Sequence, residues 1–134
     1  NDTFREWVGN NLVSQQEPLD VFSYHIYGST NPKADCGFKG LSFMDMMVGL
    51  VRATQAAGAP VFIGELGQMD PNFGGDSKAI WTRQAIDVLE KEGASLAAIW
   101  VWHFKWQPDL TVSSQTQPLL VKRITQFNKK YARW

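Results

Sequence analysis

Three apolar runs in the sequence each carry polar or aromatic side chains near one end. His25 and Tyr27 lie near the end of the first run, Glu65 lies in the second, and Trp102 lies in the third. A carboxylate, an imidazole and a phenol can serve acid–base or nucleophilic chemistry, and an indole offers a flat apolar surface for a ligand. An ionised carboxylate within an apolar strand is costly unless it is paired, so Glu65 favours a functional role over a structural one.

The segments between these runs have the signals of helix ends. Residues 3–6 and 42–45 are capping boxes, which predict helices from there to about Ser14 and to Gly58. A third helix is expected from near Asp76 to Gly93, and a fourth from Pro118 to the C-terminus. The third should bury Ile80, Ala85, Val88 and Leu89, and the fourth carries Leu120, Val121, Ile124, Phe127 and Tyr131 along one side.

Strands expected at residues 19–28, 61–66 and 96–104 alternate with these helices, in the order α-βα-βα-βα. This order predicts an α/β unit over residues 1–134, with three parallel strands and four helices. The links from helix to strand are short, whereas those from strand to helix are long. Because sites in parallel α/β folds lie at the carboxyl ends of the strands, the long links mark the functional edge.

Alternation along each strand predicts which side chains share a face. One face should carry Ser23, His25 and Tyr27 with Val61, Ile63 and Glu65, and with Ala98, Trp100 and Trp102. The other face should lie under the helices and carry Phe22, Tyr24, Ile26, Phe62, Leu66, Ile99 and Val101. His25, Tyr27, Glu65 and Trp102 are therefore expected to meet at one edge of the sheet.

Each of these residues also has an ordinary structural explanation. His25, Tyr27 and Trp102, taken singly, would be core or cleft residues, and only the shared face with Glu65 raises them to site candidates. His103 has the opposite parity and is read as structural. Three aromatic residues in the long loops could either form platforms for a sugar or simply pack within the loops: Trp106, Phe38 and Phe73. Asp70 and Asp76 could bind a cation, but turn chemistry and a helix N-cap explain them better.

Composition excludes several classes of protein. Thirteen Lys and Arg balance thirteen Asp and Glu, so there is no charge pattern suited to nucleic acid or an anionic membrane surface. A single cysteine, Cys36, excludes an internal disulfide framework and a cysteine-based metal site. The apolar stretches are too short for a membrane span. No glycine-rich phosphate loop follows a strand, which disfavours a nucleotide-binding domain.

Three segments together resemble strands six to eight of the cellulase-like family 5 glycoside hydrolases. The resemblance rests on His-x-Tyr at residues 25–27, on Pro-x-x-x-Gly-Glu-x-Gly at residues 60–67 and on Trp102. It implies a partial (β/α)8 TIM barrel in which Glu65 is the catalytic nucleophile. It further implies that His25 and Tyr27 support Glu65 and contact the sugar, and that Trp102 stacks beneath it. Trp106 is a second candidate for substrate binding, and no cofactor or metal is needed.

The resemblance also implies what this chain lacks. The family places its acid/base glutamate in an Asn-Glu pair at the end of strand four, and no Asn-Glu occurs here. We therefore expect the C-terminal portion of a retaining β-glycanase, inactive alone, acting on a β-glycan and secreted by family resemblance. An apolar sheet face with two open edges should be covered by the missing N-terminal half or by self-association. The alternative is a non-catalytic half-barrel that assembles or binds carbohydrate without hydrolysis.

Overall fold

The structure is a computed structural model that describes residues 3–13, 20–28, 40–68, 75–94, 96–101, 105–106 and 111–131. Its helices and strands, in chain order, are α1 (Phe4–Val8), the π-helical turn η1 (Gly9–Val13), β1 (Phe22–Gly28), α2 (Phe43–Ala56), β2 (Val61–Gln68), α3 (Gly75–Glu92), β3 (Leu96–Ile99) and α4 (Pro118–Tyr131). The strands form one parallel sheet in the order β1-β2-β3. The predicted α/β class, with three parallel strands and four helices, is confirmed.

Local signals in the sequence set the helix ends. Thr3 and Ser42 are the N-caps of α1 and α2, and each forms the full capping box with the acidic residue three positions on. Gly58 and Gly93 follow α2 and α3 with φ angles of 80° and 74°, which favour glycine. The chain can therefore turn directly from each helix into the next strand.

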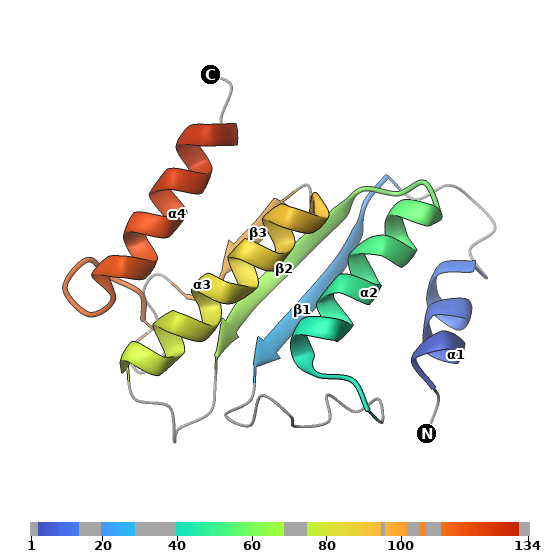
Figure 1. The fold of residues 1–134 in the computed structure, drawn as a ribbon, viewed down its shortest axis with the longest axis horizontal. Helices are drawn as coiled ribbons and strands as arrows, with labels where there is room; N and C mark the ends of the chain where they lie inside the picture. Colours follow the sequence, from blue (N-terminus) through green and yellow to red (C-terminus); the bar gives the residue numbers. More distant parts are fainter. Residues whose placement is uncertain are drawn as a thin grey trace.

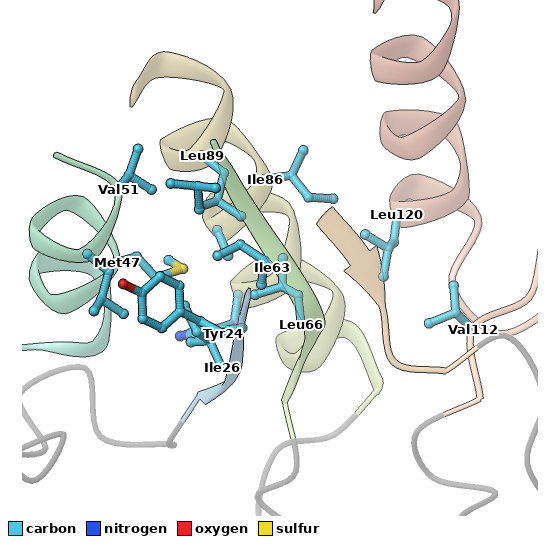
Figure 2. Packing of buried hydrophobic residues seen from close by; sticks show 14 of the residues in the cluster. Tyr24, Ile26, Met47, Val51, Ile63, Leu66, Ile86, Leu89, Val112 and Leu120 are labelled. Atoms are coloured by element: carbon cyan, nitrogen blue, oxygen red, sulfur yellow. The ribbon is translucent and has the colours of Figure 1, made fainter. Parts of the chain in front are cut away.

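Helices cover one face of the sheet (Figure 1). α2 and α3 lie side by side across the strands, and α4 packs against α3. Side chains from these helices meet those of the strands in a single core (Figure 2). The large apolar side chains that are almost wholly removed from solvent are Ile26, Met47, Val51, Val61, Ile63, Leu66 and Leu120. Burial of this kind stabilises a protein by about 1.5–3 kcal/mol for each large apolar side chain.

A bulge at Gly64 changes the alternation along β2. Tyr24 of β1 pairs with Ile63, but the next residue, His25, pairs with Glu65, so Gly64 is an extra residue in β2. A β-bulge places two successive residues against one on the partner strand and locally breaks the alternation of faces. Glu65 still lies on the same face as His25, although Ile63 does not.

The predicted faces of the β2 side chains are therefore wrong for the residues that precede Gly64. Val61 and Ile63 are 1% and 0% exposed and lie under the helices, on the face predicted for Phe62. Phe62 instead pairs with Ser23 on the opposite face. The expectation for Phe22 and Ile99 is met, since both pack against the core under the helices.

Several element boundaries and one buried residue also differ from the prediction. β1 begins at Phe22 rather than residue 19, β2 continues to Gln68, and β3 ends at Ile99. Ile80 is 51% exposed, not buried. Ile80 shares the outer side of α3 with residues 84, 87 and 91, which are all exposed, because these positions are three or four residues apart. Trp81 is buried in its place, against Gly28.

None of the helices that the structure describes is both long and apolar enough to cross a membrane.

Candidate active site

The site lies where β1 and β2 end side by side. In the parallel register, His25 pairs with Glu65 and Tyr27 pairs with Gly67. Paired residues of neighbouring strands project to the same face, so the imidazole, the phenol and the carboxylate meet on the face of the sheet that the helices leave open. The structure thus brings together three of the residues that the sequence singled out.

The side chains of Tyr27 and His25 both contact the same carboxylate oxygen of Glu65. The Tyr27 hydroxyl donates a hydrogen bond to Glu65 Oε2. His25 Nδ1 lies 3.4 Å from the same oxygen, an ion-pair distance when the imidazole is protonated. In the part of the chain that the structure describes, Glu65 Oε1 has no hydrogen-bond partner. The described residues therefore hold one carboxylate oxygen, Oε2, in place.

The side chains of the site differ in their exposure to solvent. The His25 side chain is 58% exposed, and that of Glu65 is 24% exposed. Glu65 is thus partly removed from solvent, which strengthens its bond to the phenol relative to a contact in bulk water. A carboxylate that is positioned through one oxygen and reachable through the other can act as a nucleophile or as a base.

The predicted aromatic surfaces are only partly described. Trp102 lies outside the described residues, so its expected place beneath a sugar is not tested, and the same holds for His103, Phe38, Phe73 and Asp70. Trp106 is 74% exposed, and the ammonium of Lys105 lies 4.3 Å from the centroid of its ring. Such a cation–π contact occupies one face of the indole.

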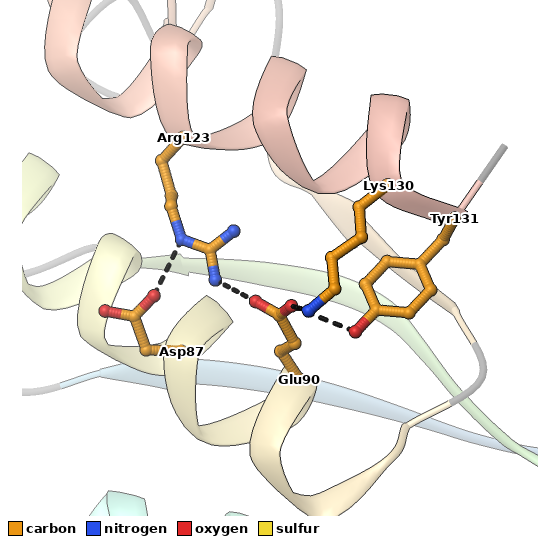
Figure 3. Close-up of polar contacts among 5 residues, drawn as sticks. All are labelled: Asp87, Glu90, Arg123, Lys130 and Tyr131. Atoms are coloured by element: carbon orange, nitrogen blue, oxygen red, sulfur yellow. Dashed lines mark hydrogen bonds and ion pairs between the residues drawn. The ribbon is translucent and has the colours of Figure 1, made fainter.

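The other described glutamates are bound away from this site. α3 starts after the carboxyl end of β2 and runs back toward the start of β3, so Glu90 and Glu92 lie at the opposite edge of the sheet. Glu92 pairs with Arg52, and Glu90 binds Arg123, Lys130 and Tyr131 (Figure 3).

Glu6 is held in the cap of α1 by Thr3, which lowers its pKa, and Glu17 lies outside the described residues. Glu65 is thus the one glutamate that the described segments place at the carboxyl ends of the strands. Within the same segments, no group of three or more His, Cys, Asp or Glu side chains is placed to hold a metal ion.

Sequence reasoning missed one residue that frames the site. Ser23, which was predicted on the face of His25, is exposed there, two residues before it. Gly64 forms the bulge that brings Glu65 beside His25. An isolated glycine inside an apolar strand is a known signal of a bulge, so the sequence did contain a clue to Gly64.

Comparison with known proteins supports the fold. No family model matches the chain, and no curated protein matches it. A solved structure, the endo-beta-1,4-mannanase from Thermotoga petrophila, matches 87% of this chain and 28% of its own, with a TM-score of 0.57 and 14% sequence identity. At this identity the likeness shows the fold alone. What the two share is an α/β fold of parallel strands and helices, and this chain spans less than a third of the length of the mannanase.

Proposed function

We propose that this chain carries the nucleophile of a retaining β-glycoside hydrolase, in the group of endo-β-glycanases that includes cellulases and mannanases. The contact of Glu65 with Tyr27 and His25, at the carboxyl ends of two neighbouring parallel strands, is the observation that carries the proposal. Active sites of parallel α/β barrels lie at this edge. The likeness in fold to a mannanase supports the same class of enzyme.

In this proposal Glu65 Oε1 attacks the anomeric carbon of the sugar while the bond from that carbon to the leaving oxygen breaks. The leaving oxygen takes a proton from a second carboxylic acid, about 5–5.5 Å from the first in retaining enzymes. Water then attacks the glycosyl–Glu65 ester and gives its proton to that second group, which releases the sugar with its configuration retained. Tyr27 keeps Oε2 in place, and Trp102 and Trp106 offer surfaces for neighbouring sugars.

The second carboxylic acid has to come from another segment. The described residues supply one carboxylate at the site, and Glu90 and Glu92 are engaged at the opposite edge. We propose that an N-terminal half-barrel supplies the acid/base group and covers the open face of the sheet. Association of two copies of this chain is the alternative, and the active protein would in either case be an assembly secreted to reach its polysaccharide.

Covalent trapping tests the role of Glu65. The protein that unites this chain with an N-terminal half is treated with a 2-deoxy-2-fluoro glycoside, and its peptides are mapped by mass spectrometry. We expect the label on Glu65, and we expect Glu65→Gln to lower kcat by at least about 10³-fold while sugar binding survives. The chain by itself should hydrolyse β-glycans negligibly, because general acid catalysis supplies about 10²–10⁴-fold.

Glu92→Gln is the matched control, because it removes a glutamate at the far edge of the sheet and should leave kcat unchanged. A label on another residue, or full activity of Glu65→Gln, would end the proposal. Sugar binding without any label or turnover would instead favour the non-catalytic half-barrel.

A further inference from the structure

Two glycines flank Glu65 in places where a side chain would enter the site. A Cβ atom at position 64 would lie 2.8 Å from Ser23 Oγ and 3.1 Å from His25 Nε2. A Cβ atom at position 67 would lie 2.8 Å from the carbonyl oxygen of Trp100 and 3.6 Å from Tyr27 Cδ1. Contacts below 3.0 Å are not tolerated by packed atoms, so neither position has room for a side chain unless a neighbour moves.

Space, and not backbone conformation, is what these two positions require. The described glycines with positive φ are Gly40, Gly58 and Gly93, and neither Gly64 nor Gly67 is among them. Other residues can adopt the backbone conformation found at positions 64 and 67. A substitution there would therefore act through the atoms it meets.

The two glycines meet different kinds of obstacle. The atom closest to Gly67 belongs to the backbone of Trp100, next to β3, and it cannot move without disturbing the end of the sheet. The atoms closest to Gly64 belong to the side chains of Ser23 and His25. The imidazole is 58% exposed, so it is free to turn toward solvent.

We propose that Gly64 is a positioning residue: the absence of a side chain at the bulge is what lets His25 lie against Glu65. The imidazole uses its two nitrogens in different ways, with Nδ1 toward Glu65 Oε2 and Nε2 toward Gly64. A methyl group at position 64 would push on the Nε2 edge of the ring and turn Nδ1 away from the carboxylate. Its effect on catalysis rests on the proposed function, but the placement of the ring does not.

Four variants separate this positioning role of Gly64 from a general effect on folding. Each is made in the protein that unites this chain with an N-terminal half. Gly64→Ala carries the perturbing methyl group, and Ser23→Ala/Gly64→Ala removes the hydroxyl that the methyl group meets first. Gly9→Ala is the matched control, because a Cβ atom there meets nothing within 4 Å. Gly67→Ala serves as a comparison in which the added methyl group meets a backbone atom, the carbonyl oxygen of Trp100.

The main measurement is the NMR spectrum of histidine-labelled protein, with the His25 ring signals assigned through His25→Gln. In the parent protein, Glu65→Gln should shift these signals, because the ring lies against the carboxylate. We expect Gly64→Ala to preserve the amide spectrum of the strands but to shift the ring signals and abolish their response to Glu65→Gln. The added Ser23→Ala should restore that response, and Gly9→Ala should never lose it. Gly67→Ala should disturb the amide signals of the strands themselves.

The rate of labelling by the 2-deoxy-2-fluoro glycoside is the second measurement. Gly64→Ala should slow it about tenfold, with recovery in the double variant. An unchanged response of His25 to Glu65→Gln in Gly64→Ala would overturn the inference, and so would loss of the folded state in both Gly64→Ala and the double variant. If the glycoside labels none of these proteins, the proposed function fails, whereas the ring signals still decide the role of Gly64.

Discussion

Glu65 differs from Glu90 and Glu92, the two glutamates at the end of α3, in the kind of partner that holds it. Hydrogen bonds from Lys130, Arg123 and Tyr131, in that order of importance, lower the pKa of Glu90 to about 2. A hydrogen bond from Arg52 likewise lowers the pKa of Glu92. Among the described residues, Glu65 is held by the Tyr27 hydroxyl and approached by the His25 imidazole, and neither partner is a Lys or Arg. A carboxylate that is not bound to a Lys or Arg side chain can act as a nucleophile.

The Tyr27 hydroxyl is the part of the site that a single atom change tests most directly. Tyr27→Phe keeps the ring and removes the hydrogen bond to Glu65. If this chain united with an N-terminal half is the hydrolase proposed above, we expect its kcat to fall about 10- to 100-fold with little change in KM. The magnitude follows from the roughly 1.5–3 kcal/mol that hydrogen bonds to charged groups contribute. Steady-state kinetics with a β-glycan substrate measures it.

Tyr24→Phe is the matched control for this change. Tyr24 lies on the other face of β1, where its hydroxyl is 2.8 Å from Thr54 Oγ1 in the buried core. Its loss should lower the free energy of unfolding by about 1 kcal/mol and leave kcat unchanged. Equal kcat values for Tyr27→Phe and the parent would argue against a role of the phenol in positioning Glu65.

At the scale of elements, the polar contacts between α3 and α4 gather on Glu90 (Figure 3). Lys130 Nζ lies 2.7 Å and the Tyr131 hydroxyl 2.9 Å from Glu90 Oε1, and Arg123 binds both Glu90 and Asp87. Apolar contacts of Leu120, Val121 and Ile124 add to the packing of α4 on the core. Lys130 and Tyr131 thus bind Glu90 from the C-terminal end of α4, whereas Arg123 binds it from among the apolar contacts nearer the start.

The lowered pKa of Glu90 predicts a pH dependence of stability. The carboxyl group has an ordinary pKa near 4.5 in the unfolded chain and about 2 in the folded one, so its contribution is present above about 4.5 and is lost as the pH falls toward 2. Lys130→Met removes the largest cause of the shift. We expect it to weaken the loss of stability between pH 5 and pH 2, and the change should be small because the Lys130 side chain is exposed.

Urea unfolding of the intact protein at several pH values measures this effect. Lys129→Met is the control, since Lys129 is exposed and has no ion-pair partner among the described residues. The same pH dependence in Lys130→Met as in Lys129→Met would show that Lys130 does not hold Glu90.

The elements were largely predictable because their signals are local. Thr3 and Ser42 begin helices through hydrogen bonds within four residues, and Gly58 ends one through its own φ angle. The bulge at Gly64 was not predicted. Alternation along β2 assumes that each residue pairs with one residue of β1, and only the pairing itself shows that Gly64 has no partner there. Ile80 was misplaced for a similar reason, since the packing of α3 against β2, α2 and α4 selects its buried side.

The sequence predicted that Glu65 shares a face with His25 and Tyr27, and the register agrees. It also placed Ile63 on that face, wrongly, because alternation along the strand cannot include the extra residue at Gly64. The place of Trp102 stays a prediction.

At the scale of the whole molecule, the two faces of the sheet differ in their cover. Helices lie over one face (Figure 1), and the other carries the site together with exposed positions of β3. Leu96 is 57% exposed and pairs in register with Phe62 on that open face. An exposed sheet face with strand edges at both sides favours association.

Leu96→Lys tests whether the open face associates. We expect the parent chain at micromolar concentration to sediment as a complex larger than its 15.1 kDa, with itself or with an added N-terminal half. A lysine at position 96 should weaken that complex at least tenfold, because a charge would have to be desolvated in the contact. Ile80→Lys is the control, since Ile80 is 51% exposed on the outer side of α3. A stable monomer with an N-terminal half present would contradict the expectation.

The bulge has a consequence for how this sheet tolerates changes in chain length. A single insertion or deletion in a regular strand turns every later side chain to the wrong face. At Gly64 the extra residue already stands between two correctly paired positions, Tyr24 with Ile63 and His25 with Glu65. Removing it would leave a continuous ladder in which Glu65 and Leu66 keep their faces. Position 64 is thus a point where an ancestral or engineered β2 can be one residue shorter without turning its core outward.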